Sequence, residues 1–164
     1  MAATAAKTFS SRLTALACGL TALLSSLVLL GWIFEIPALT TFIPGGPPAP
    51  VPTAFLLLLA AGSLLLLRLP RLPQLAALLG AVLLIMGVLG LAEIWLGYSS
   101  GIQEKITRLF LSSPTHVAAH MLPHAVLSFV FLGAALLLMA SDGMGRSYIA
   151  QGFALAVMVL ALQA

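Results

Sequence analysis

The sequence predicts an all-α membrane protein of about five transmembrane helices, built from a repeated helical hairpin. Hydrophobic residues make up 62% of the 164 residues, and charged residues only 7%. A soluble domain carries about 25% charged residues, so this chain has too little charge to cover a water-soluble fold. Long apolar runs divide the chain, and its basic residues gather in alternate connections between those runs.

Five apolar runs are the candidate spans, at residues 13–34, 51–67, 74–96, 123–140 and 148–164. A helix needs about 20 apolar residues to cross a hydrocarbon layer of about 30 Å, and each run comes close to that length. The apolar core of a signal peptide is only about 7–15 residues long, so we expect the first run to remain as an anchor helix. The lipid bilayer is therefore the first expected partner.

The basic residues predict the orientation of the helices. Cytoplasmic connections of membrane proteins carry an excess of Lys and Arg. Most of the basic residues lie in the N-terminal tail and in the connections at 68–73 and 141–147, namely Lys7, Arg12, Arg68, Arg71 and Arg146. The connections at 35–50 and 97–122 hold only Lys105 and Arg108. We therefore expect a multi-pass protein of a bacterial inner membrane with a cytoplasmic N-terminus and two outward loops.

A repeat relates the second and fourth runs at an offset of 71 residues. It pairs Pro52 with Pro123, Ala54 with Ala125 and Gly62 with Gly133, and seven leucine, proline and small-residue positions match in all. Parallel repeats of helical hairpins occur in membrane proteins. We predict one transmembrane domain, 1–164, with hairpin units at 13–67 and 74–140 and the start of a third at 148–164. The odd fifth helix favours a piece of a longer protein; the alternative is a natural five-helix chain.

The two outward loops differ in content. Prolines and glycines fill the first loop, which we interpret as a lid that reconnects two helices. In the second loop, apolar residues recur at helical spacing, with polar residues between them: Ile102, Ile106, Leu109 and Phe110 against Gln103, Glu104, Lys105, Thr107 and Arg108. This pattern predicts an amphipathic helix lying flat on the membrane surface. Ser113 and Pro114 predict a second short helix after it.

Three histidines follow that helix at a spacing of four residues. On one straight helix, His116, His120 and His124 would form a stripe able to bind a transition metal or haem. Pro123 argues against one helix, because proline inside a helix clashes with the preceding turn. It is expected to open the fourth span instead, which leaves His116 and His120 as the candidate metal ligands. The alternatives are solvent-reachable interfacial histidines and a pH sensor.

Glu93 is the only Asp, Glu, Lys or Arg residue inside a predicted span. Such a residue is a functional candidate because its burial is costly. It lies about one turn from the outer end of its helix, so we favour a structural role in which it reaches the interface or pairs with Lys105 or Arg108.

Small residues mark close packing on the same helix. Ala76 and Gly80 form a small-xxx-small pair, with Gly87 on about the same face. Small residues let helices approach closely. Packing within the chain is the favoured interpretation, and self-association into a homodimer is the alternative.

Short motifs in both hairpin units resemble a known group of membrane regions. They read Gly-Trp-Ile-Phe-Glu-Ile-Pro-Ala-Leu (31–39) with Pro-Thr-Ala-Phe-Leu-Leu-Leu-Leu-Ala-Ala-Gly (52–62), and Leu-Gly-Tyr-Ser-Ser-Gly-Ile-Gln-Glu (96–104) with Pro-His-Ala-Val-Leu-Ser-Phe-Val-Phe-Leu-Gly (123–133). They resemble the N-terminal multi-helix membrane regions of bacterial sensor histidine kinases, including hybrid kinases and diguanylate cyclases with PAS domains. In that group an acid often follows the Gly-Ile step, where this chain has Gln103 and Glu104. His116 and His120 are outside the pattern.

The resemblance implies a signal-input region whose kinase or cyclase transmitter lies outside this chain. No catalytic motif accompanies it here, so the chain itself is expected not to be an enzyme and to need no cofactor beyond the metal or haem considered above. The alternative is a small accessory subunit of a larger membrane complex, associated with pigment or haem. No basic stripe with interleaved aromatics is present, so nucleic acid is not an expected partner.

Overall fold

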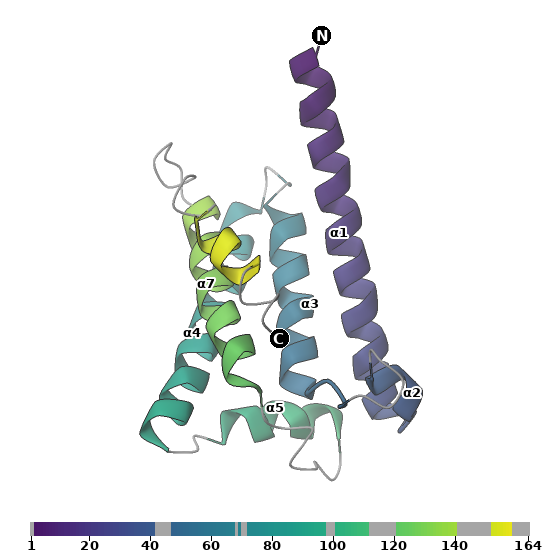
Figure 1. Cartoon of the computed structure of the whole chain (residues 1–164), viewed down its shortest axis with the longest axis vertical. Coiled ribbons are helices and arrows are strands. Elements are labelled where there is room, and N and C mark those ends of the chain that lie inside the picture. Colours follow the sequence, from purple (N-terminus) through teal and green to yellow (C-terminus); the bar gives the residue numbers. More distant parts are fainter. Residues whose placement is uncertain are drawn as a thin grey trace.

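The computed structural model describes residues 2–41, 47–67, 69, 72–97, 101–111, 121–140 and 152–158, and these form helices and their connections, with no strand among them (Figure 1). The helices are α1 (Ala2–Ile33), α2 (Pro37–Thr40), α3 (Val51–Leu66), α4 (Pro73–Leu96), α5 (Ile102–Phe110) and α7 (Pro123–Ala140). Residues 152–158 are also helical. The all-α prediction is confirmed over this part of the chain.

Four long helices stand side by side, and two short ones lie at one end of them (Figure 1). The most extensive packing joins α4 to α7, followed by α1 to α3, and α3 also packs against α4. Helix α5 runs across the ends of the long helices, beside α2 and opposite the N-terminus. We call this the α5 end of the bundle. The described parts of the two loops predicted to face outward thus lie at the same end.

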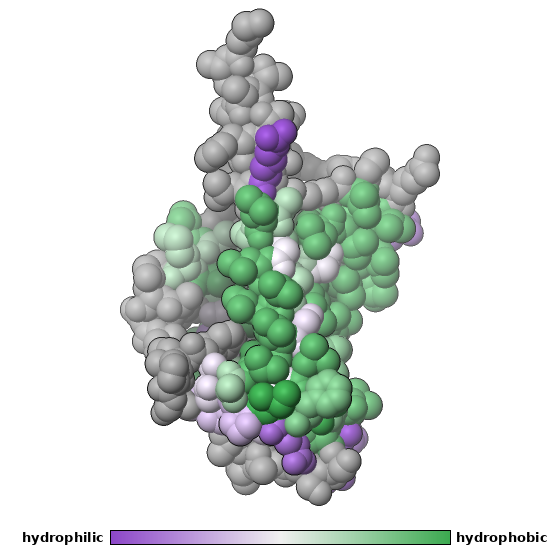
Figure 2. Space-filling model, turned by 90° about the vertical axis from the view of Figure 1, so that its right-hand side faces the viewer, coloured by the Kyte–Doolittle hydropathy of each residue, from purple (hydrophilic) through white to green (hydrophobic). Residues whose placement is uncertain are grey.

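Three helices are long and apolar enough to cross a membrane: Thr14–Ile33 within α1, Pro73–Leu96 and Pro123–Ala140. In Figure 2, apolar side chains cover the α1 side of the molecule between hydrophilic residues above and below. These features indicate a membrane protein. Helix α3 has 16 residues and measures about 24 Å, short of a full span. Five spans and the repeat therefore stay predictions, and of the fifth run only residues 152–158 are described.

The helix boundaries follow from proline and glycine. Pro73 and Pro123 each begin a helix, as proline does well at a first position where no intrahelical donor is needed. The expectation that Pro123 opens its own helix is confirmed. Gly97 ends α4 with a φ of 62°. The first predicted run, 13–34, matches the apolar stretch Thr14–Ile33. Helix α1 itself begins earlier, at Ala2, because the alanine-rich segment before the span has high helix propensity.

Glycines bring α4 and α7 together. A methyl group on Gly133 would lie 2.5 Å from the backbone nitrogen of Leu84, and one on Gly87 would lie 2.7 Å from that of Val130. No side chain larger than hydrogen fits at either position unless the backbones separate. Gly80 also faces α7, where a methyl group would lie 3.1 Å from Cβ of Leu136. The small face predicted on this helix therefore packs within the chain.

Helices α3 and α4 are joined by a buried polar contact. The Ser63 hydroxyl donates to the carbonyl oxygen of Ala76 at 3.0 Å, and both residues are fully buried. The bond lies next to the connection between the two helices, at the end of the bundle away from α5. It adds direction to a contact that is otherwise apolar, since hydrogen bonds between membrane helices contribute about 0.6 kcal/mol each.

We expect Gly133→Ala to destabilise the protein by about 1–3 kcal/mol, because the added methyl group must push α7 away from the backbone of α4. Gly62→Ala is the matched control, since a methyl group there would meet only Leu79 Cδ1 at 4.0 Å. Thermal unfolding in detergent measures both variants. Equal midpoints for the two would contradict the close approach of α4 and α7.

Candidate functional site

One glutamine connects three segments at the α5 end. The Gln103 amide Nε2 donates to Glu93 Oε2 at 2.6 Å, and its Oε1 accepts the backbone N–H of Met121 at 3.0 Å. Gln103 is 7% exposed. A side-chain amide suits this position because it both donates and accepts. Helix α5 is thereby attached to α4 and to the residue two places before α7.

Thr107 completes this polar contact one turn further along α5. It is fully buried, and its hydroxyl donates to the carbonyl oxygen of Gln103 at 2.8 Å. We call Glu93, Gln103, Thr107 and Met121 the junction. Every member takes part in a hydrogen bond, which is what burial of polar groups at a helix end requires.

The amphipathic helix predicted in the second loop is present as α5, and its buried face is polar. The buried residues are Gln103 and Thr107, whereas Leu109 is 77% exposed. The backbone N–H of Met121 and the carboxylate of Glu93 need polar partners at this helix end, and Gln103 supplies a hydrogen bond to each. Lys105 and Arg108 are exposed.

Glu93 lies near the outer end of α4, as predicted, and is half-buried. The sequence predicts that Glu93 reaches the interface or pairs with Lys105 or Arg108; the structure shows that its carboxylate accepts a hydrogen bond from Gln103 of α5. A neutral amide therefore holds the carboxylate at this point. A functional role for Glu93 beyond this contact stays a prediction.

The other end of α5 reaches the α1–α3 pair. The Phe110 ring packs against Phe55 of α3, with centroids 5.8 Å apart and planes tilted by 55°. Phe110 and Leu111 also pack with Trp32 around a buried cluster of Val28, Leu29, Val51 and Ala54. A single nine-residue helix thus contacts both helix pairs.

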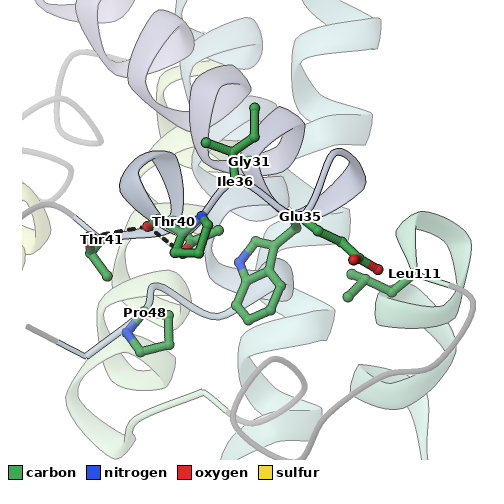
Figure 3. Close-up of a pocket in the computed structure, with 9 residues that line it drawn as sticks. Gly31, Glu35, Ile36, Thr40, Thr41, Pro48 and Leu111 are labelled. Atoms are coloured by element: carbon green, nitrogen blue, oxygen red, sulfur yellow. Dashed lines mark hydrogen bonds between the residues drawn. The ribbon is translucent and has the colours of Figure 1, made fainter.

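A pocket of about 440 Å³ lies where α1, α2 and Leu111 meet (Figure 3). Its described lining comprises Gly31, Trp32, Glu35, Ile36, Pro37, Thr40, Thr41, Pro48 and Leu111. The volume falls in the range of about 300–1,000 Å³ that small-molecule sites occupy. Described residues of the first loop, predicted only as a lid that reconnects two helices, therefore form one wall of a pocket that no local sequence pattern indicates.

The proposed metal ligands His116 and His120 lie outside the described residues. His124 is the second residue of α7, and its carbonyl oxygen accepts the Ser128 hydroxyl. Within the described ranges, no group of three or more His, Cys, Asp or Glu residues could hold a metal ion. The metal or haem hypothesis thus stays a prediction for the undescribed segment.

We expect Gln103→Leu to destabilise the α5 end by about 1–3 kcal/mol, because it leaves the Met121 N–H and the Glu93 carboxylate without this partner. Hydrogen exchange followed by mass spectrometry should show faster exchange in α5 and at the start of α7. Lys105→Leu introduces the same residue at an exposed position of α5 and serves as the control. If both variants exchange alike, the junction does not hold α5 in place.

No family model, curated protein or solved structure matches this chain.

Proposed function

We propose that this chain is the membrane-embedded signal-input region of a bacterial signal-transduction protein, with its transmitter domain outside this sequence. The proposal includes five spans built from repeated hairpins and a cytoplasmic N-terminus, which put the α5 end in the periplasm. Its first support is the resemblance of residues 31–62 and 96–133 to sensor membrane regions. Its second support is the way α5 connects the pocket to the long helices.

The position of α5 carries the proposal. At one end, Leu111 lines the pocket next to Trp32 and Glu35. At the other end, Gln103 is hydrogen-bonded to Glu93 of α4 and to Met121 before α7. A ligand that changes the position of Leu111 therefore acts on a helix whose far end is bonded to one candidate span and to the residue two places before another.

Thermodynamics sets what such a device needs. A ligand shifts a conformational equilibrium only by its difference in affinity for the two states. Coupling free energies between sites are commonly about 1–3 kcal/mol, which is the size of one or two buried hydrogen bonds. Making or breaking the contacts of Gln103 would supply a change of that order.

The natural polypeptide provides the direct test. We expect an N-terminal epitope tag on the chromosomal gene to recover, from native membranes, a polypeptide that carries a histidine-kinase or cyclase domain, as identified by mass spectrometry. Gln103→Leu in that polypeptide should change transmitter output, and Lys105→Leu should not. Stoichiometric recovery with a pigment- or haem-bearing membrane complex would instead support the accessory-subunit alternative and overturn the sensor proposal.

The orientation predicts which residues are reachable from outside. In a Cys18→Ala background, a membrane-impermeant maleimide should label Lys105→Cys in intact spheroplasts, because Lys105 is exposed at the α5 end. Arg12→Cys, exposed on α1 at the other end, should react only after lysis. Five spans also put Ala164→Cys outside. Labelling of position 12 but not of position 105 in intact spheroplasts would show the opposite orientation and contradict the predicted topology.

A further inference from the structure

The pocket at the α5 end has no unused side-chain donor among its described lining residues. The indole N–H of Trp32 donates to the carbonyl oxygen of Ala49 at 2.8 Å. The hydroxyls of Thr40 and Thr41 both donate to the carbonyl oxygen of Pro37, at 3.0 and 3.3 Å. What remains are oxygen lone pairs, so the lining favours a ligand that donates hydrogen bonds or carries positive charge.

Glu35 supplies the only charge among those lining residues. Figure 3 shows its carboxylate on the side of the pocket where Leu111 lies, with Thr41 and Pro48 opposite. The remaining lining is mostly apolar. The pocket therefore combines one carboxylate with mostly apolar walls, and these features complement an organic cation.

The backbone holds Glu35 in a conformation that suits glycine. At the end of α1, the N–H of Ile36 bonds to the carbonyl oxygen of Gly31 at 2.8 Å, and that of Glu35 to Trp32 at 3.4 Å. This pair of bonds ends helices through a left-handed residue, which is usually glycine. Glu35 occupies that position with a φ of 54°. A side chain that costs stability at such a place points to a function for its carboxylate.

Trp32 adds a second feature that recognises cations. Its indole is held by the bond to Ala49 and packs against the buried cluster of Val28, Leu29, Val51 and Ala54. The face of a tryptophan ring attracts ammonium groups more strongly than other aromatic rings do. A fixed ring beside a carboxylate is a favourable place for a cation.

We propose that this pocket binds a small organic cation, an ammonium group attached to an apolar body, through the carboxylate of Glu35 and the ring of Trp32. As a ligand class for the signal-input region, it rests on the proposed function for its biological meaning. Binding itself is measured on the chain alone, so its failure leaves the test on the natural polypeptide unaffected.

The binding experiment uses benzyltrimethylammonium as probe and maltoside micelles, which contain no ammonium group. Trp95→Phe removes the other tryptophan, which is 83% exposed and outside the pocket lining, so that Trp32 fluorescence reports binding. We expect a saturable change with the probe. Its neutral isostere, neopentylbenzene, should bind at least about fivefold more weakly. Equal binding of the two, or no saturation, would overturn the proposal.

Variants at position 35 separate binding from folding. Glu35→Gln should lower the affinity for the probe about fivefold, which is the effect expected from the loss of an exposed ion pair. Glu35→Gly should also lower this affinity. It should nevertheless raise the midpoint of thermal unfolding by a few degrees, because glycine adopts the left-handed conformation without strain. Glu104→Gln, a carboxylate of α5 that is not among the lining residues, is the control. Unchanged affinity in both position-35 variants would overturn the proposal.

Lipid headgroups also carry ammonium groups. Adding phosphatidylethanolamine to the micelles distinguishes the source of the ligand. Competition with the probe would identify a lipid headgroup as the cation, and its absence would identify a soluble amine. Both outcomes require the same carboxylate and ring, and both depend on Glu35 in the variants above.

Discussion

The arrangement at the α5 end depends on the two hydrogen bonds that Gln103 makes, one with Glu93 and one with Met121. Gln103 attaches α5 to Glu93 of α4 and to the backbone before α7 with a single buried amide. The backbone N–H of Met121 and the carboxylate of Glu93 would otherwise need water or another partner at an apolar helix end. Once α5 is anchored there, its length carries Phe110 and Leu111 to the α1–α3 pair.

Close approach of α4 and α7 makes that anchoring possible. Gly87 and Gly133 bring the two backbones to a separation that no larger residue allows. The end of α4 and the start of α7 consequently lie near enough for one side chain to bond to both. At the opposite end of the bundle, the hydrogen bond from Ser63 to Ala76 likewise joins α3 to α4. Packing by small residues sets the distances, and a few buried hydrogen bonds set the register.

The pocket and the junction differ in how tightly they are built. Gln103, Thr107 and Met121 of the junction are buried, and the hydrogen bonds of the junction are made within the protein. The pocket is lined by an exposed carboxylate in a left-handed backbone and by a short four-residue helix. Under the proposed function, a ligand would bind first in the pocket and act on the junction through α5. This order suits an input region, in which a weakly held site biases a well-defined helix arrangement.

The sequence by itself determined the membrane class, the α7 boundaries and the presence of α5, because apolar runs, an opening proline and helical spacing are local signals. It also placed the small residues of α4 in a packing face. Only the tertiary structure decided that Gln103 bonds to Glu93, and that Trp32, Glu35 and Leu111 line one pocket. The pocket joins residues from separate hairpins. The face of α5 that becomes buried depends on polar groups at the end of α4 and before α7, which no periodicity in α5 itself encodes.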